Sequence, residues 1–406
     1  MRLVAVTTGA ALGVLATALP ALAVPAPGAG SAPQAAPERH RCVSSVPYVS
    51  GEGGYDTYRI PAVVTTRSGT VLAFAEGRVD GAGDSGDIDL VVRRSTDGGC
   101  TWGPLSVVAA GHGDTRGNPA PVIDPATGRI VLLTCYNSGE VSEAQILRGE
   151  VTPEQTRRVF VQYSEDDGRT FSAPREITDQ VKPDNWRWYA TGPGHATALT
   201  RGPHAGRLVV PANHSAAPPA GSADTGQEAR YYGAHALYSD DGGDSWHVGY
   251  VDADYDGHIN SNESSAAQLP DGRLYFSSRD QNGSSLGNRV DAYSLDGGES
   301  LVNGGYAVQE TLGRVPVVQA SVLQTSWPGG PLLFSAPSDP TARQAMALWR
   351  SDDAGRTFRQ VTTLSTAPAA YSDLVQTGHR VGLLYETGEA GPYERIEFRL
   401  FERGDL

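Results

Sequence analysis

The sequence predicts an all-β fold, a six-bladed β-propeller, from three observations: a short repeat that recurs five times, short strand-like runs between turn residues, and the lack of a long helical period. The repeat is Ser-x-Asp-x-Gly-x-Thr/Ser, usually followed by an aromatic residue. Its copies start 55 to 75 residues apart, close to the length of four strands with their loops. The five copies are Ser95–Trp102, Ser164–Phe171, Ser239–Trp246, Ser294–Leu301 and Ser351–Phe358.

Each copy of the repeat is typical of a tight turn. The Ser and Asp side chains can bond nearby backbone groups, Gly supplies a positive φ, and the aromatic residue packs beneath the turn. The fourth copy has Leu301 in the aromatic position. Because every part of the pattern serves turn geometry, the repeat predicts scaffold and not a reaction centre.

Strand-like runs lie between Gly, Asp, Asn and Pro turns along the chain and predict hairpins. Divided among six blades, residues 43–406 give about 60 residues per blade, which agrees with the spacing of the repeat. We therefore expect five blades with the repeat and one without it. The clearest runs are 70–75, 129–135, 207–211, 273–278, 331–335 and 381–385.

The first 23 residues predict a secretory signal peptide. Arg2 precedes an apolar run from Leu3 to Leu19, and Ala21-Leu22-Ala23 has the small-residue pattern of a cleavage site. A membrane anchor is the alternative, but the apolar run is short. Residues 24–42 are rich in Ala, Pro and Gly and predict a disordered leader. Residues 43–406 are then a single secreted domain without a membrane span.

Composition excludes several classes of function. A net charge of −14 argues against nucleic acid and anionic membrane surfaces as partners. The three cysteines, Cys42, Cys100 and Cys135, lack the spacing of zinc ligands, and their odd number leaves one thiol free or bridged to another chain. We expect structural roles for all three, leave their pairing open, and expect no cofactor.

Three arginines indicate an anion site. Arg59, Arg279 and Arg343 stand at or just after the ends of predicted strands in different blades. The strand ends of successive blades converge on one central mouth in a propeller. Three guanidinium groups gathered there would hold one planar carboxylate through bidentate, charge-assisted hydrogen bonds.

The chain resembles the bacterial-type exo-sialidases, or neuraminidases, over residues 43–406. The resemblance rests on Arg59-Ile60-Pro61, on the five repeats, which that family calls Asp boxes, and on the order of acidic and tyrosine residues. It implies a sialidase β-propeller catalytic domain that releases terminal sialic acid from sialylated glycoconjugates with retention of configuration. Linkage preference stays open, and we expect a monomer.

The resemblance also implies residue roles at the substrate's carboxylate and leaving group. Arg59, Arg279 and Arg343 resemble the three arginines that bind the sialic acid carboxylate. Asp84 stands eleven residues before the first repeat serine and resembles the acid/base aspartate, with Arg78 beside it. Asp87 and Asp89 are the alternatives if the register is shifted.

Further roles follow for the nucleophile and its supports. Tyr371 resembles the nucleophile, Glu263 its general base, and Glu386 the carboxylate that holds Arg59 in place. A neutral phenol suits a substrate whose anomeric carbon carries a carboxylate, because a carboxylate nucleophile would be repelled. A tyrosine with a pKa near 10 needs such a base, and Asp84 needs a raised pKa to act as an acid.

One position departs from the family pattern. Many relatives have an aspartate before proline after the first repeat, where it contacts substituents of the sugar ring, but this chain has Asn118-Pro119. An amide still bonds hydroxyl groups, so Asn118 leaves the reaction class unchanged and opens the choice of substrate. Asp114 is a candidate replacement.

The segment from Asp252 to Glu263 matches the spacing of an EF-hand calcium loop. Its flanks read as strands and not as helices, and Glu263 would have to serve two purposes. We therefore predict no metal at this segment, although calcium binding there stays an open alternative.

Three other functions are consistent with parts of the sequence. A trans-sialidase would use the same residues and pass the sugar to a galactoside. An enzyme acting on related acids without the N-acetyl group is suggested by Asn118. A non-catalytic Asp-box propeller that binds ligands would explain the repeats but not the full set of candidate site residues.

Overall fold

The computed structural model describes residues 5, 9–18, 42–283 and 288–406. Contacts divide the chain into two units, Met1–Arg41 and Cys42–Leu406. The predicted signal peptide, 1–23, and leader, 24–42, fall mostly outside the described residues and stay predictions. None of the helices in the described parts of the chain is long and apolar enough to cross a membrane.

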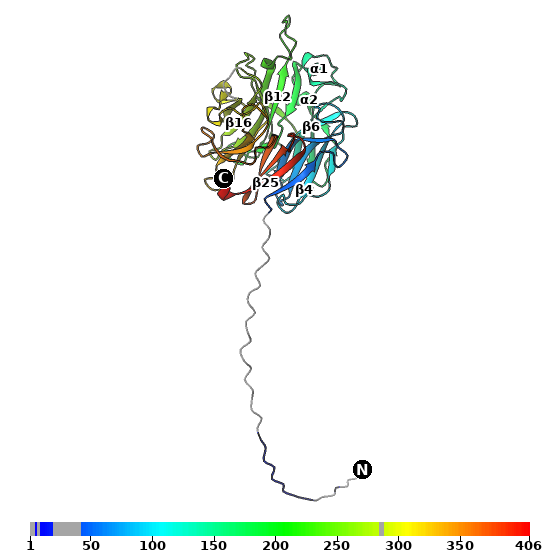
Figure 1. Ribbon diagram of the computed structural model, residues 1–406, viewed down its shortest axis with the longest axis vertical. Coiled ribbons are helices and arrows are strands. Elements are labelled where there is room, and N and C mark those ends of the chain that lie inside the picture. The colour runs from blue at the N-terminus through cyan, green and yellow to red at the C-terminus, as the bar shows by residue number, and fades with distance from the viewer. Residues whose placement is uncertain (1–4, 6–8, 19–41, 284–287) are drawn as a thin grey trace. The chain divides into compact units, whose positions relative to one another are not determined.

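The second unit is an all-β, propeller-like assembly of antiparallel sheets (Figure 1). Four sheets have four or five strands each. They are β1 (Ser44–Val49), β25 (Arg395–Glu402), β24 (Arg380–Thr387) and β23 (Ala369–Thr377); β10 (Trp186–Thr191), β11 (Thr197–Ala198), β12 (Leu208–Ala216), β13 (Tyr232–Ser239) and β14 (His247–Val251); β15 (Ser261–Gln268), β16 (Leu274–Asp280), β17 (Arg289–Ser294) and β18 (Ala307–Val308); and β19 (Ser321–Gln324), β20 (Leu332–Pro337), β21 (Met346–Ser351) and β22 (Arg359–Thr363).

The remaining sheet has eight strands, so the prediction of six separate blades is wrong as a count of sheets. A single parallel bridge between Ile88 and Thr115 joins two antiparallel runs into one sheet. The strands are β2 (Thr57–Thr65), β3 (Val71–Arg78), β4 (Ile88–Ser95), β5 (Ser106–Ala109), β6 (Thr115–Ile123), β7 (Ile130–Asn137), β8 (Arg158–Ser164) and β9 (Arg175–Glu176). Such a bridge has no signature in the sequence.

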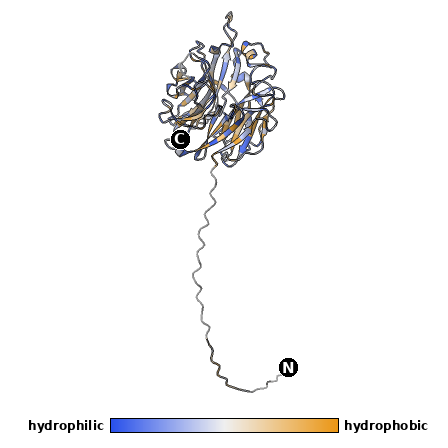
Figure 2. Cartoon of the chain, viewed as in Figure 1, coloured by the Kyte–Doolittle hydropathy of each residue, from blue (hydrophilic) through white to orange (hydrophobic). Residues whose placement is uncertain are grey.

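Helices are short and connect strands. Two α-helices are described, α1 (Glu143–Arg148) and α2 (Thr178–Val181), with short 3-10 turns η1 (Ala229–Tyr231), η2 (Val302–Gly304), η3 (Glu310–Leu312) and η4 (Arg403–Asp405). The core lies between neighbouring sheets; Leu133 of β7 and Val210 of β12, for example, belong to one buried cluster. Hydrophobic and hydrophilic residues accordingly both occur along the strands (Figure 2).

All five repeats form the predicted turn. Each begins at the last residue of a strand, and these strands are β4, β8, β13, β17 and β21. In the first, the Ser95 hydroxyl donates to Asp97 at 2.7 Å, and Asp97 accepts from the Thr101 amide at 2.9 Å and the Thr101 hydroxyl at 2.7 Å. The fourth copy makes the same bonds around Asp296, with Leu301 partly buried beneath it. The pattern is therefore scaffold, as expected.

The two ends of the second unit meet in one sheet. β1 pairs with β25, so the first and last strands lie side by side (Figure 1). A disulfide joins Cys42 to Cys100, which settles the pairing that the sequence left open. Cys42, the last residue of the predicted leader, is therefore tied to the first repeat, whereas Cys135 is buried and unpaired.

Strands that begin the antiparallel runs are bent by register shifts. Shifts occur in β2 between Arg59 and Ala62, in β6 between Gly117 and Ala120, in β10 between Trp186 and Tyr189, in β15 between Ser261 and Ser264, and in β23 between Ala369 and Ser372. A bulge re-aims the side chain at the bend. Candidate site residues lie at these bends.

We predict that Asp97→Ala lowers the melting temperature by a few degrees and leaves the chemistry of the pocket unchanged. Burial raises the pKa of Asp97, but its bonds from Thr101, Ser95 and the Cys100 amide outweigh this and lower it to about 2. A lowered folded-state pKa contributes stability above the unfolded-state value and loses it as pH falls toward 2. Acid titrations of the wild type and variant should therefore converge near pH 2.

The matched control is Asp184→Ala, because Asp184 is exposed and lies outside the repeats. Equal melting temperatures for Asp97→Ala and Asp184→Ala at neutral pH would contradict the scaffold role.

Candidate active site

One cavity of about 180 Å³ gathers most of the predicted site residues. Those that line it are Arg59, Arg78, Asp84, Asn118, Glu263, Arg279, Arg343 and Tyr371. Glu386, the remaining one, is fully buried and bonds to residues of the wall. Positions as distant in sequence as Arg59 and Tyr371 therefore meet, because the bent strands converge there.

A tyrosine, a carboxylate and an arginine form a tight group. The Tyr371 hydroxyl donates to Glu263 Oε1 at 2.6 Å, and Arg279 Nη1 donates to Glu263 Oε2 at 2.6 Å and to the Tyr371 oxygen at 3.4 Å. Burial, together with the charge of Glu263, raises the pKa of Tyr371. The phenol is therefore protonated at neutral pH and has an acceptor in place for its proton.

A buried carboxylate fixes the backbone beside Arg59. Glu386 accepts from the Ile60 amide at 2.8 Å, from the Tyr371 amide at 3.0 Å and from Arg59 Nε at 3.3 Å. Ile60 has a φ of 59°, which is rare for a β-branched residue and needs support from its surroundings. Glu386 supplies that support and matches its predicted place beside Arg59.

Three guanidinium groups surround the Tyr371 ring. Arg59 lies 5.0 Å and Arg343 5.7 Å from the ring centroid, and Arg279 contacts the hydroxyl. Tyr393, which the sequence analysis did not single out, joins this group. Its oxygen accepts from Arg343 Nη1 at 2.9 Å, and its ring centroid lies 4.2 Å from the Arg59 guanidinium. Positive charge is thus concentrated over a single side chain.

Asp84 stands at the edge of this group, with a side chain 58% exposed. It accepts from Arg78 at 2.8 Å and from Arg59 at 3.4 Å. Burial by itself raises the pKa of Asp84, but Arg78 and Arg59 outweigh it and lower the pKa below its usual value. The expectation of a raised pKa for Asp84 is therefore wrong in this structure.

A chain of polar contacts leads from Asp84 across the cavity. Glu76 accepts from Arg78 at 2.6 Å and, through its other oxygen, from the Asn118 amide at 2.8 Å. A side chain at Gly117 would collide with the Glu76 carboxylate, so glycine is required there. Asn118 has a φ of 53°, a conformation that asparagine tolerates.

The aspartates named as alternatives in the sequence analysis are bonded to other groups in the structure. Asp87 accepts from the Gly113 amide, and Asp89 from the Gly111 amide and Tyr55. Asp114 bonds Tyr136 and the Gly139 amide, and it is not among the described residues that line the cavity. The register that assigns Asp84 to the pocket is therefore the better one.

Four polar residues that line the cavity beside Asn118 were not predicted from the sequence, and we call this group with Asn118 the polar end of the cavity. Asn118 shares it with Arg157, Asn213, Glu143 and Tyr232, and the Tyr232 hydroxyl donates to Glu143 at 2.7 Å. Burial raises the pKa of Glu143. These residues belong to no sequence motif. Their positions near the ends of predicted strands are the one signal from which they could have been predicted.

The calcium-loop alternative is not supported. The segment lies between strands β14 and β15, and both oxygens of Glu263 are bonded to other side chains. Within the described residues, no group of three or more potential ligands is arranged to hold a metal ion.

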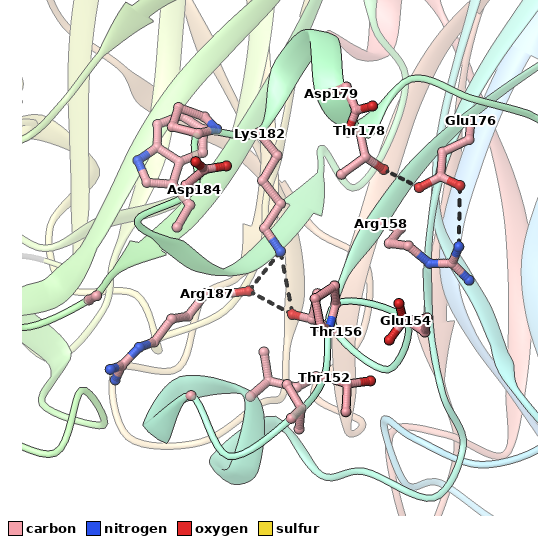
Figure 3. Close-up of a pocket in the computed structure, with 17 residues that line it drawn as sticks. Thr152, Glu154, Thr156, Arg158, Glu176, Thr178, Asp179, Lys182, Asp184 and Arg187 are labelled. Atoms are coloured by element: carbon pink, nitrogen blue, oxygen red, sulfur yellow. Dashed lines mark hydrogen bonds and ion pairs between the residues drawn. The ribbon is translucent and has the colours of Figure 1, made fainter.

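A second, larger hollow of about 590 Å³ lies beside β10 and the segment after α1 (Figure 3). Lys182 extends into it and donates to the backbone oxygen of Arg187 at 3.0 Å (Figure 3). It also donates to the backbone oxygen of Arg157 at 2.7 Å. None of the predicted site residues lines this hollow. Its lysine instead ties together the backbone behind the polar end of the cavity.

Comparison with known proteins identifies the family of this chain. A family model described as a BNR repeat-like domain matches residues 69–385. A sialidase of Micromonospora viridifaciens is 32% identical over 84% of this chain, which spans 51% of that relative's length. An exo-alpha-sialidase of Aspergillus fumigatus is 31% identical over 93% of this chain and 90% of its own length.

Solved structures agree in fold. A Hadza microbial sialidase superposes with a TM-score of 0.73 at 26% identity, covering 87% of this chain and 67% of its own. A leech intramolecular trans-sialidase has a TM-score of 0.72 at 18% identity over 88% of this chain and 70% of its own, a likeness of fold alone. From sequence, fold and site together, the chain belongs to the sialidase family, whose members named above are glycoside hydrolases.

Proposed function

We propose that this protein is a retaining exo-α-sialidase that hydrolyses terminal sialic acid from glycoconjugates. The observation that carries the proposal is the 2.6 Å bond from the Tyr371 hydroxyl to Glu263, surrounded by three guanidinium groups. A sialoside carboxylate beside Arg59, Arg279 and Arg343 would set the anomeric carbon against the phenol oxygen.

In the first step the Tyr371 oxygen attacks the anomeric carbon, and its proton passes to Glu263 Oε1. The bond to the leaving oxygen breaks as Asp84 donates a proton to it. In the second step water attacks the same carbon, Asp84 takes the water's proton, and the tyrosyl bond breaks with return of the proton from Glu263. Two displacements at one carbon retain the anomeric configuration.

Substrate binding itself can prepare Asp84 as an acid. Burial raises the pKa of Asp84, but the charges of Arg78 and Arg59 outweigh it and lower the pKa. A bound carboxylate neutralises part of the Arg59 charge, which raises the pKa of Asp84 when its proton is needed. Protonation of the acid is thus coupled to occupancy of the site.

We predict that Tyr371→Phe lowers kcat on an umbelliferyl sialoside by roughly 10³-fold or more, because the variant has no nucleophile. Fluorophore release checks this. The control is Tyr163→Phe, whose hydroxyl bonds Gly243 away from the cavity. Turnover by Tyr371→Phe at the wild-type rate would contradict the mechanism.

A separate assay distinguishes transfer from hydrolysis. Lactose is added to the wild type, and a sialylated lactose product would indicate transfer.

We predict that the alkaline limb of kcat lies at higher pH than that of kcat/KM, because the complex raises the pKa of Asp84 above its free-enzyme value. In Asp84→Asn this limb disappears, and turnover of a sialyl-lactose substrate falls roughly 10²-fold or more. The pH profiles of both proteins check this. An unchanged alkaline limb in Asp84→Asn would assign the proton donor elsewhere.

We also propose that the protein is exported after cleavage following Ala23 and acts as a monomer. The Cys42–Cys100 disulfide supports an oxidising compartment. Intact mass and size-exclusion chromatography of protein from the culture medium check both points. Retention in the cells with residues 1–23 attached would contradict export.

A further inference from the structure

The polar end of the cavity, made by Asn118, Arg157, Asn213, Glu143 and Tyr232, has no task in the reaction proposed above. These side chains come from β6, β12, β13, α1 and the residue before β8. Asn118 and Arg157 are linked to the Glu76 side of the pocket, because Glu76 accepts from the Asn118 amide and Arg157 donates to Asn118 Oδ1. A ring bound by its carboxylate at the three arginines would direct its opposite substituents here.

Asn213 is the first sign of a missing ligand. Its side chain is fully buried and lines the cavity, yet neither its amide nitrogen nor its amide oxygen has a partner among the described residues. Buried polar groups are nearly always paired in folded proteins. An unpaired donor and an unpaired acceptor side by side match a hydroxyl group, which can accept and donate at once.

Arg157 is the second sign. It is 3% exposed, donates to Asn118 Oδ1 at 2.6 Å and to Asn137 Oδ1 at 2.9 Å, and leaves Nε unpaired. No ion pair within the described residues involves it, and the two side chains that accept its hydrogen bonds are neutral amides. Lys182 donates to the Arg157 backbone oxygen at 2.7 Å and so helps to fix its position. A fixed cationic donor therefore faces whatever enters this end.

The aromatic surface that could receive a methyl group is shared with a guanidinium. Trp188 lines the cavity, but the Arg157 guanidinium lies 4.0 Å from its ring centroid. The methyl of an N-acetyl substituent would meet a guanidinium and amides in place of an aromatic face, and would leave those groups unpaired. A hydroxyl substituent would pair them.

We propose that the polar end selects sialic acids that carry a hydroxyl group, and not an N-acetyl group, at ring carbon C5. This inference rests on the proposed sialidase function. It assigns Arg157 and Asn213 as specificity-determining residues for the C5 substituent, with Asn118 holding Arg157 in place.

The test compares two umbelliferyl glycosides that differ only at C5, one with N-acetyl and one with hydroxyl. The wild type is expected to have a kcat/KM roughly tenfold or more higher for the hydroxyl compound. Arg157→Met, which exposes Trp188, is expected to reverse or abolish this ratio. Arg158→Met is the matched control, since Arg158 pairs with Glu176 in the other hollow (Figure 3) and should keep the wild-type ratio.

Asn213→Leu keeps the test decisive if Arg157→Met does not fold. Removing an unpaired buried amide should leave the melting temperature equal or higher, while kcat/KM for the hydroxyl compound falls roughly tenfold. Equal or better cleavage of the N-acetyl compound by the wild type would overturn this inference and leave the sialidase function standing. Cleavage of neither compound by folded wild type would refute the proposed function itself.

Discussion

The buried carboxylate of Glu386 is the interaction on which the arrangement of the pocket depends. It bonds the backbone of Ile60 near the start of the second unit and that of Tyr371 near its end, and it also holds Arg59. The same sheets close the ring, since β1 pairs with β25 and β25 with β24, the strand of Glu386. Closure of the fold and alignment of the tyrosine with its arginines are therefore coupled. Loss of this carboxylate would leave the buried Arg59 with only its longer contact to Asp84, and Ile60 without support for its positive φ.

Bent strands explain how a stable sheet assembly presents so many polar groups at one point. Regular pairing would alternate the side chains between the two faces of each strand. The register shifts in β2, β6, β10, β15 and β23 interrupt that alternation where the strands meet the cavity. Tyr371, Glu263 and Asn118 lie at such bends. The five repeats lie outside these bends, at the ends of other strands, so scaffold and chemistry occupy different parts of each sheet.

The sequence was informative where structure is local. Every bond of the Asp97 turn joins residues within five positions, so the repeat could be recognised and its role predicted. The position of Asp84 depended on family resemblance and on its spacing from Ser95, and a shift of register would have selected Asp87 or Asp89 instead. The direction of the shift in the pKa of Asp84 could be predicted only from its distances to Arg78 and Arg59, which the sequence does not provide. The merging of two runs by one bridge at Ile88, and the unpaired amide of Asn213, arise only from the folded arrangement and leave no pattern in the chain.

The central claim is that Tyr371 forms a covalent bond to the sugar, and trapping that bond tests it most directly. A sialosyl fluoride with a second fluorine at C3 slows the departure of the sugar from the nucleophile more than its arrival. Peptide mass analysis of the inactivated wild type is expected to find one sugar attached to the peptide that contains Tyr371, and none on Tyr371→Phe. Attachment of the sugar to another residue would contradict the account. Hydrolysis of the probe without any covalent adduct would contradict it as well.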